Sequence, residues 1–310
     1  MHGLSPMDAR RNVPGVAAPP ADCYRIRGTV NAGTGRHDEP DRRSIPGRHP
    51  DEARAPKHRE PTAAARRLSS MPLPPIKALA FDVFGTVVDW RSGIAREASP
   101  ILARLGRTDV DPHRFADGWR TRYQPALEEV RSGRRPFVIL DTLHRESLED
   151  LLRHHAIDPV ALGDDGLSNL THAWHRLDPW PDSVEGLTRL KTRFPIVTLS
   201  NGNIALMLEM ARRGGLPWDA ILGAEVSRIY KPLPESYLAT ARMLAIDPAE
   251  LCLVAAHHSD LAAARAAGLR TAYIDRPLEY GGRPAPDAAA AQDWDHRADS
   301  LTQLADDLCR

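Results

Sequence analysis

Short apolar runs and amphipathic stretches alternate along most of the chain. The apolar runs, each bounded by turn residues or charged segments, cover residues 76–81, 195–200, 221–224, 251–255 and 271–274. Apolar positions at helical spacing lie between most of them, over residues 184–193, 204–213, 234–245 and 260–267. Strands that alternate with helices form a parallel sheet with helices on both faces, so the pattern predicts an α/β fold.

Residues 93–182 break this rhythm, because they contain no convincing strand. Apolar positions recur there at helical spacing, which predicts helices over about 94–106, 113–132, 138–155 and 160–176. We therefore expect a helical cap domain, residues 93–182, inserted into a Rossmann-like parallel-sheet core made of residues 71–92 and 183–310. Open parallel sheets bind ligands at the carboxyl ends of their strands, so this insertion would form a lid over the ligand site.

The first 70 residues differ from the rest of the chain. They hold nine prolines and thirteen Lys or Arg residues with almost no apolar periodicity, so they cannot bury enough surface to offset the entropy of ordering. The pattern changes at Met71. We expect residues 1–70 to be either a disordered extension or the product of a start assigned too early, and we favour the second. Interspersed acidic residues argue against a transit peptide.

Charge and cysteine content narrow the function classes. The chain has 41 basic and 41 acidic residues, which gives no general reason to expect nucleic acid or an acidic membrane as a partner. Cys23, Cys252 and Cys309 lack metal or redox spacing, which indicates a reduced, cytoplasmic chain. No apolar run approaches the roughly 18 to 20 residues that a membrane span needs, and the N-terminus has no apolar core like that of a secretory signal.

The first apolar run ends in a carboxylate, within the sequence FDVFGTVVDW that begins at Phe81. Asp82 directly follows the strand, so we expect it at the carboxyl edge of the sheet, where Gly85 permits a tight turn. Thr86 can hydrogen-bond near Asp82 and hold its rotamer. A lone Asp in such a place is more often the cap of a turn, so the interpretation depends on its context.

This stretch resembles the first motif of the haloacid dehalogenase superfamily, in which the Asp is a nucleophile that forms a covalent ester or phosphoester. The resemblance covers about residues 71–310. Most phosphatases of the superfamily carry a second Asp two positions later, which protonates the leaving group. Phe84 stands there in this chain, and the type II (S)-2-haloacid dehalogenase branch has an aromatic residue at that position. A departing halide needs no proton, so the substitution suits dehalogenation.

Two further motifs agree with the resemblance in order and spacing. The sequence VTLSNGN reads as a strand followed by a polar turn, and the resemblance implies that Ser200 and Asn201 bind a substrate carboxylate. By itself a Ser-Asn-Gly turn is an ordinary loop. Lys231, which precedes Pro232, stands where the family carries a Lys that offsets negative charge around the nucleophile. Tyr237 follows six residues later, as a Tyr does in the dehalogenase branch.

The motif LVAAHHSD, which ends at Asp260, departs from the magnesium-dependent members. They usually carry Gly-Asp where this chain has Ala255 and Ala256, so a ligand carboxylate is missing and we expect neither a metal nor another cofactor. The family's dehalogenases place a Ser, an Asn and an Asp here to orient and activate the hydrolytic water. Only Asp260 matches, while His257 replaces the Asn. His257 could accept a proton from water, hydrogen-bond it, or be purely structural. His258 stays unassigned.

The predicted cap contains the motif WRTRYQ, which begins at Trp119. Dehalogenases of this branch hold an Arg on the early cap in a similar Trp-Arg setting, where it helps to bind the departing halide and the substrate anion. Arg120 is therefore the candidate, with Arg122 as its main rival and a solvated helix face as the alternative. Trp119 and Tyr123 would belong to the cap core or the pocket wall.

The resemblance implies hydrolytic, metal-independent dehalogenation of small (S)-2-haloalkanoic acids to 2-hydroxyacids through an ester on Asp82. The expected catalytic residues are Asp82, Thr86, Lys231, His257 and Asp260. The expected substrate-binding residues are Phe84, Arg120, Ser200, Asn201 and Tyr237, and Trp90 would assist at the halide. Three alternatives stay open: a magnesium-dependent phosphatase of the same superfamily, a ring-opening hydrolase that also uses a carboxylate nucleophile, and a non-catalytic binding protein. The sequence leaves the preferred halogen, the chain length and the oligomeric state open, although homodimers are common among relatives.

Overall fold

The computed structural model describes residues 74–310, so the expectations for residues 1–70 lie outside the described part of the chain. Six strands form a parallel sheet in the order β5-β4-β1-β6-β7-β8. In chain order they are β1 (Ala78–Phe81), β4 (Ile196–Ser200), β5 (Ala220–Gly223), β6 (Leu251–Ala255), β7 (Arg270–Ile274) and β8 (His296–Ala298). Two short strands, β2 (Val88–Asp89) and β3 (Asp178–Pro179), pair antiparallel beside it.

Helices cover both faces of the sheet. The central strand β1 shows this, because its alternate residues are buried in two different core clusters, one on each face. Leu79 and Phe81 belong to a core cluster with residues of α6 (Ser183–Lys191), α7 (Ile204–Gly214) and α11 (Leu301–Leu308). Ala78 and Ala80 belong to a second cluster with residues of α9 (Pro234–Met243) and α10 (His258–Ala266). A strand buried on both faces reads as a continuous apolar run, as this one does. The remaining short elements here are α8 (Ala224–Ser227), η3 (Pro248–Glu250) and η4 (Ala288–Ala290).

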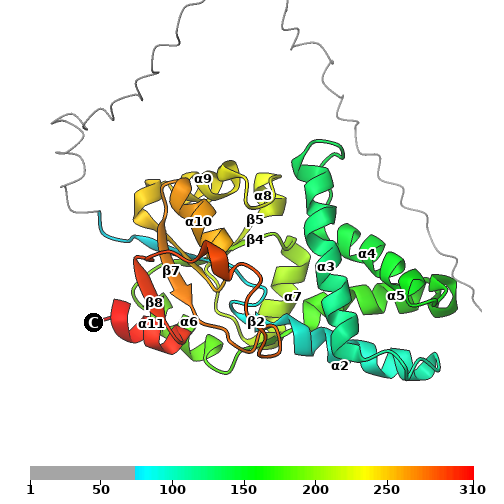
Figure 1. Cartoon of the computed structure of the whole chain (residues 1–310). Coiled ribbons are helices and arrows are strands. Elements are labelled where there is room, and N and C mark those ends of the chain that lie inside the picture. Colours follow the sequence, from blue (N-terminus) through cyan, green and yellow to red (C-terminus); the bar gives the residue numbers. More distant parts are fainter. Residues whose placement is uncertain (1–73) are drawn as a thin grey trace, which may run out of the picture. The chain divides into compact units, whose positions relative to one another are not determined.

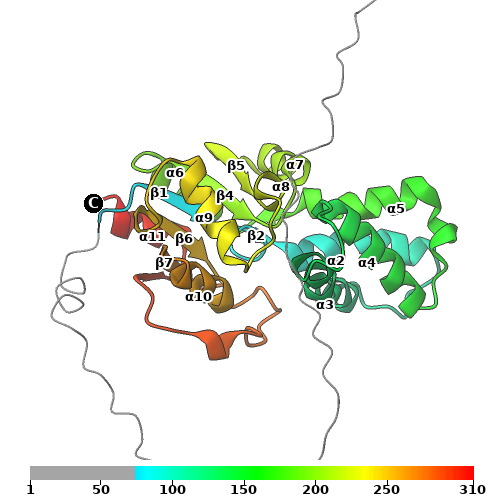
Figure 2. The ribbon, with the colours of Figure 1, turned by 90° about the horizontal axis from the view of Figure 1, so that it is seen from above.

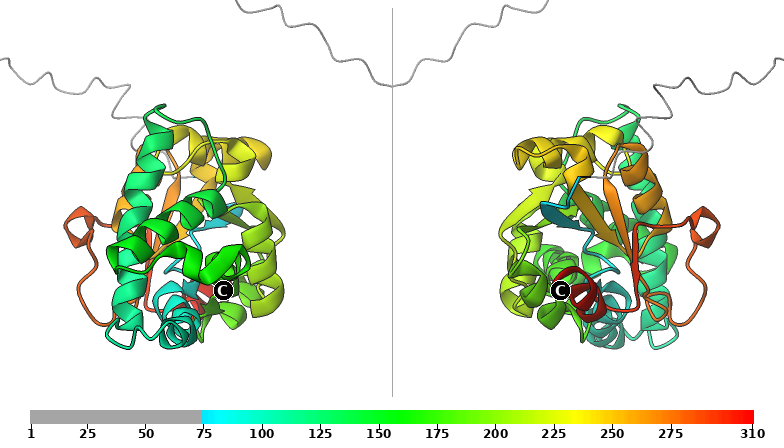
Figure 3. Two further views of the ribbon diagram at one scale, coloured as in Figure 1. Left: turned by 90° about the vertical axis from the view of Figure 1, so that its right-hand side faces the viewer. Right: turned by 90° about the vertical axis from the view of Figure 1, so that its left-hand side faces the viewer.

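Between β2 and β3 the chain forms a group of helices that we call the helical segment, residues 90–176. It contains α2 (Trp90–Arg104), α3 (Pro112–Arg131), α4 (Leu140–His154), η1 (Pro159–Leu162), α5 (Gly163–Thr171) and η2 (His172–Arg176). The segment lies at one end of the sheet in Figures 1 and 2, and Figure 3 shows it from that end. Its buried side chains, among them Trp119 and Leu151, continue the core cluster of Leu79 and Phe81.

Most of the expected elements are present, with ends shifted by a few residues. Helix α2 begins at Trp90, four residues before the expected start, because the Asp89 side chain accepts a hydrogen bond from the Ser92 amide and caps it. The single helix expected over 160–176 is wrong. The chain forms η1, α5 and η2 there, and Gly163, with φ of 66°, interrupts the helix.

Several short elements, β2 among them, were not expected from the sequence. The interval 93–182 does contain a strand, the two-residue β3, and the sheet has a further edge strand, β8, which is followed by α11. The division into core and cap at residues 93 and 182 stays a prediction. Within residues 74–310, no helix has the length and apolar character needed to cross a bilayer.

Candidate active site

Asp82 lies at the carboxyl edge of the sheet, directly after β1, as expected. Its amide donates a hydrogen bond to the Val254 carbonyl of the neighbouring strand β6, and the residue is only 7% exposed. The chain then turns through Gly85, whose φ of 85° is readily available only to glycine. This turn brings the Thr86 hydroxyl back to donate to Asp82 Oδ2 at 2.9 Å. Thr86 is itself fixed, since its oxygen accepts from the Ala256 amide at 2.9 Å.

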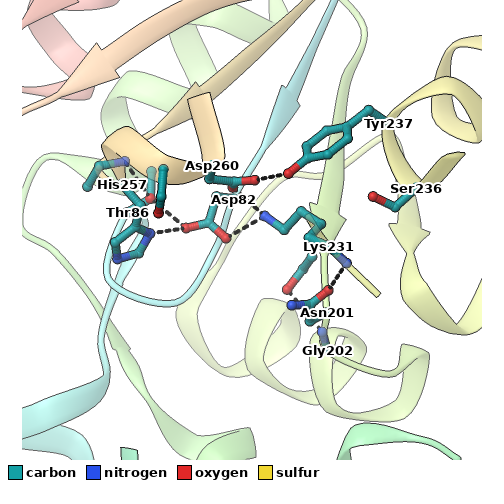
Figure 4. Close-up of polar contacts among 12 residues, drawn as sticks. Asp82, Thr86, Asn201, Gly202, Lys231, Ser236, Tyr237, His257 and Asp260 are labelled. Carbon is teal, nitrogen blue, oxygen red and sulfur yellow. Dashed lines mark hydrogen bonds and ion pairs between the residues drawn. The ribbon is translucent and has the colours of Figure 1, made fainter. Parts of the chain in front are cut away.

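Lys231 joins Asp82 to Asp260. Its ammonium donates to Asp82 Oδ1 at 2.9 Å and to Asp260 Oδ2 at 2.5 Å (Figure 4). The other oxygen of Asp260 accepts from the Tyr237 hydroxyl at 2.6 Å. All four side chains are buried, so every one of these charges is paired inside the protein. The structure therefore brings together four of the residues that the sequence singled out from separate parts of the chain.

His257 contacts the candidate nucleophile directly. Its Nδ1 lies 2.9 Å from Asp82 Oδ2, on the side opposite Lys231 in Figure 4. Its Nε2 lies 2.9 Å from Oε1 of Glu279, a residue that the sequence analysis did not single out. Glu279 also accepts a hydrogen bond from the Trp90 indole at 2.9 Å. His257 is thus held between two carboxylates.

His258 plays a different part in the structure. Its ring stacks on Tyr273 with centroids 4.4 Å apart, and its Nδ1 accepts a hydrogen bond from the Trp294 indole at 3.1 Å. It does not line the cavity beside Asp82. His258 therefore supports the packing of β7 and the loop before β8, and the two adjacent histidines are easily distinguished.

The charges in this cluster determine its protonation. Burial alone would raise the pKa of Asp82, but the charges of Lys231 and His257 and their hydrogen bonds outweigh it and hold that pKa far below its ordinary value. Burial opposes the charge on Lys231, yet Asp260 and Asp82 raise its pKa above the usual range. For His257 burial is likewise overcome, and Glu279 and Asp82 raise its pKa well above 6.5. Near neutral pH, Asp82 is ionised and both cations are charged.

A cavity of about 720 Å³ opens in front of Asp82. Its wall includes Phe84, Trp90, Arg120, Tyr123 and Asn201, so residues of the helical segment and the sheet edge line it together. The exposed apolar and aromatic surface of such a cavity, with a few convergent polar groups, is typical of a small-molecule site.

Arg120, the candidate anion-binding arginine of the sequence analysis, is part of this wall. Its guanidinium lies 4.4 Å from the ring centroid of Tyr123 and 5.5 Å from that of Trp90. Its Nη1 is buried and has no hydrogen-bond partner among residues 74–310. The rival Arg122 instead donates to Asp150 at 2.6 Å and to the Gly118 carbonyl, and it does not line the cavity. Of the two arginines that the sequence offered, Arg120 is therefore the one that can meet an anion in the cavity.

The expected substrate-binding residues divide into two groups. Phe84, Arg120 and Asn201 line the cavity, whereas Ser200 and Tyr237 do not. The Ser200 hydroxyl accepts from the Gly202 amide at 3.1 Å and is 1% exposed. Asn201 donates to the Tyr123 hydroxyl and accepts from the Lys231 amide, both at 2.9 Å. Ser200 thus shapes the turn, and Asn201 presents its amide to the cavity.

Trp119 belongs to the core of the helical segment rather than to the cavity wall. It is 1% exposed, and its indole donates to the His144 carbonyl at 3.1 Å. Within residues 74–310, no group of three or more His, Cys, Asp or Glu side chains is arranged to hold a metal ion. Phe84, where superfamily phosphatases carry an acid, is 3% exposed and packs edge-on against Trp174.

Residues 76–268 match the family model described as haloacid dehalogenase-like hydrolase. The chain is 30% identical over 236 residues to (S)-2-haloacid dehalogenase 4A of Burkholderia cepacia, covering 74% of this chain and 93% of that one. It is 28% identical over 205 residues to a phosphoglycolate phosphatase of Chromobacterium violaceum, covering 64% of this chain and 84% of that one.

Among solved structures, the chain is similar to a defluorinating L-2-haloacid dehalogenase. The two are 49% identical with a TM-score of 0.73, and the match covers 76% of this chain and 96% of that one. The family model, the curated relative from Burkholderia cepacia and this solved structure therefore all point to the same family of hydrolases.

Proposed function

Because the chain belongs to the haloacid dehalogenase-like hydrolase family, we propose that it removes halide hydrolytically from small (S)-2-haloalkanoic acids. One observation carries this proposal. The ionised carboxylate of Asp82 lies at a cavity that offers a phenyl ring, Phe84, in place of a leaving-group acid, and the Nη1 atom of Arg120, which is buried and has no hydrogen-bond partner among residues 74–310. A halide leaves without a proton, whereas an alkoxide usually needs one.

In the first half of the reaction, Asp82 attacks C2 of the substrate from the side opposite the halogen. Lys231 offsets the charge of Asp82 while leaving it ionised, and Thr86 holds its rotamer. The Asn201 amide, in the turn shaped by Ser200, binds the substrate carboxylate. Arg120, with the rings of Phe84 and Trp90 beside it, receives the halide. Attack from the rear inverts the configuration at C2.

In the second half, water attacks the ester carbonyl carbon and a 2-hydroxyacid leaves. Asp260, which Tyr237 and Lys231 hold in place, is the base that orients this water. Asp82 is then regenerated with one oxygen from solvent. In a single turnover in heavy-oxygen water, label should therefore appear first in the protein carboxylate, and label going directly to product would exclude the covalent route.

Fluoride is among the halides that we propose the enzyme releases. A related protein of 49% identity is a defluorinating L-2-haloacid dehalogenase. In this chain the Nη1 of Arg120 is a charged N–H donor in a buried wall, and fluoride, the smallest halide, accepts hydrogen bonds most strongly. Release without a metal ion, a homodimeric state, a cytoplasmic location and the lack of nucleic-acid or membrane partners remain predictions from the sequence.

The test is a halide-release panel with chloroacetate, fluoroacetate and both enantiomers of 2-chloropropionate, each with and without EDTA. We expect release from the (S) enantiomer, inversion to the hydroxyacid, and no effect of EDTA. Phosphate release from phosphoglycolate that depends on magnesium, without halide release, would establish the phosphatase instead. Opening of an azetidine carboxylate without halide release would establish the ring-opening hydrolase, and inertness toward all substrates would favour a binding protein.

A further inference from the structure

Glu279 is a buried carboxylate that the proposed reaction does not use. It is 2% exposed and accepts hydrogen bonds from His257 Nε2 and from the Trp90 indole, each at 2.9 Å. The turn after β1 makes room for it, because a Cβ added to Gly85 would lie 2.2 Å from Glu279 Oε1. A buried charge is costly unless it is paired, so the arrangement requires a positive partner, and His257 is in contact with it.

The hydrogen bonds of His257 define its protonation. An ionised carboxylate can only accept hydrogen bonds, and both ring nitrogens of His257 face one: Nδ1 faces Asp82 and Nε2 faces Glu279. Both nitrogens therefore carry hydrogen. Burial opposes the imidazolium, but the charge of Glu279 and the hydrogen bonds with both carboxylates raise the pKa of His257. Arg120, Tyr280 and His258 are the other titratable or charged groups near this pair.

The same geometry leaves no place for a water molecule between His257 and the nucleophile. A general base must lie within hydrogen-bond reach of the water, with the water between base and carbon. Instead Nδ1 donates directly to Asp82 Oδ2 at 2.9 Å, and the Thr86 hydroxyl donates to the same oxygen at 2.9 Å. Two donors at this distance from one oxygen match the geometry of an oxyanion hole.

The two oxygens of Asp82 thus differ. Oδ2 accepts from Thr86 and His257, whereas Oδ1 accepts only from Lys231 and keeps a lone pair for attack. Oδ1 then becomes the bridging oxygen of the ester, and Oδ2 becomes its carbonyl oxygen. Negative charge develops on the carbonyl oxygen when water adds, at the atom that the two donors already hold.

We propose that Thr86 and the His257 imidazolium form an oxyanion hole for hydrolysis of the Asp82 ester, and that Glu279 is the positioning residue that keeps His257 protonated on both nitrogens. The inference rests on the proposed function and deepens its second half. His257 is then a catalytic hydrogen-bond donor rather than a base, and Trp90 holds Glu279 in place.

The steps balance. In alkylation the Oδ1–C2 bond forms, and the C2–halogen bond breaks with its electron pair leaving on the halide. In hydrolysis the water oxygen bonds to Cγ of Asp82, Asp260 takes one proton, and the carbonyl pair moves onto Oδ2 beneath Thr86 and His257. Collapse breaks the Cγ–Oδ1 bond, and the departing alkoxide takes the proton from Asp260. The new carboxyl group loses its proton to solvent, so the net products are hydroxyacid, halide and one proton.

The decisive experiment follows decay of the ester in a single turnover at a series of pH values, with the ester quantified by intact-protein mass spectrometry. A donor works only while it carries its proton, so the decay rate constant should fall as pH rises through the pKa of His257 in the ester. A base works only when deprotonated, so a rate constant that rises over this range would overturn the proposal.

Glu279→Gln sharpens the test, because it removes the counter-charge but keeps an acceptor for the His257 Nε2–H. The fall in rate should move to lower pH, and at alkaline pH ester decay should slow by about 10- to 100-fold while halide release in the first turnover is little changed. A wild-type profile that is flat is also informative, since Glu279→Gln should then bring the fall into range. A flat profile in both proteins would overturn the proposal.

Two further variants complete the design. His257→Leu, which cannot donate a hydrogen bond, should slow ester decay by about 100-fold and abolish the pH dependence, which covers the case in which Glu279→Gln does not fold. Glu209→Gln is the matched control, because Glu209 also accepts a hydrogen bond from a histidine, His175, but does not line the cavity. Its profile should equal that of the wild type. If no ester forms on Asp82 in any protein, the proposed function itself fails, whereas an ester with the wrong pH dependence refutes only the oxyanion hole.

Discussion

Within residues 74–310, two histidines each lie between two carboxylates, and only one of them borders the cavity. His257 lies between Asp82 and Glu279, and His175 lies between Asp141, at 3.0 Å, and Glu209, at 2.8 Å. His175 belongs to η2 in the helical segment, whereas Glu209 belongs to α7 beside the sheet. The contacts of His175 with Asp141 and Glu209 therefore link the helical segment to the sheet domain.

The surroundings of the carboxylates distinguish the two clusters. Asp141 accepts a further hydrogen bond from Asn203 at 2.8 Å, and the Glu209 side chain is 54% exposed. The Asp82 side chain, by contrast, is 10% exposed and forms part of the cavity wall, and that of Glu279 is 3% exposed. A histidine bridged by carboxylates is thus a structural device when its partners are satisfied or solvated. It becomes chemically useful when one partner faces a space that a ligand can enter.

The largest expected difference between the two histidine sites is in halide release, when the charge of Asp82 or of Asp141 is removed. Asp82→Asn should lower halide release by at least about 1,000-fold, because the nucleophile is lost. Asp141→Asn should leave halide release within a few-fold of the wild type, since Asp141 does not line the cavity. Initial rates measured by ion chromatography decide the matter. Equal damage from both substitutions would show that the His175 cluster also serves the reaction.

A smaller difference is expected in the free energy of unfolding, when Glu279 or Glu209 is replaced by Gln. Glu279→Gln should lower the free energy of unfolding by about 1–3 kcal/mol, because it removes one of the two counter-charges of the buried His257 imidazolium. Glu209→Gln should cost only about 0.2–1 kcal/mol, since its partner contact is largely solvated. Urea unfolding at neutral pH, followed by circular dichroism, measures both. A larger loss for Glu209→Gln would reverse the comparison.

The smallest effect is the pH dependence of the His175 contact. Burial opposes the charge on His175, but Asp141 and Glu209 raise its pKa above 6.5. A group whose folded pKa is raised contributes stability that is fully present below its unfolded pKa and is lost as pH rises through the folded value. The difference in unfolding free energy between wild type and Glu209→Gln should therefore be larger at about pH 5.5 than at about pH 9. An equal difference at both would mean that His175 does not change its charge between these two pH values.

Part of the site could be predicted because strand ends of a parallel sheet meet. Asp82 directly follows β1, and Asp260 lies in the first turn of α10, shortly after β6, which is the hydrogen-bonded neighbour of β1. The strand ends therefore indicated one edge of the sheet for both, while the family resemblance was needed to interpret them as site residues. Lys231 follows no strand directly, and only the family resemblance pointed to it. Its position between the two carboxylates depends on the whole fold.

Glu279 escaped prediction because burial is a tertiary property. It lies in a stretch rich in Arg, Pro and Gly, whose composition is typical of a solvent-exposed loop. One signal was available: residues 275–279 follow the apolar run 271–274, so they leave the sheet at the same edge as Asp82. Strand β8 escaped for a related reason, since His296-Arg297-Ala298 has no apolar run and is defined only by its pairing with β7.

Gly85, in the loop after β1, and Glu279, far along the chain, constrain each other's side-chain size. The place where a side chain at position 85 would begin is already filled by the carboxylate of Glu279. Positions 85 and 279 therefore share one volume, and the positive φ at 85 independently favours glycine there. A library that randomises position 85 should return glycine while 279 is Glu, and a shorter side chain at 279 should relieve only the steric part of the cost, since the backbone strain of any other residue at 85 remains.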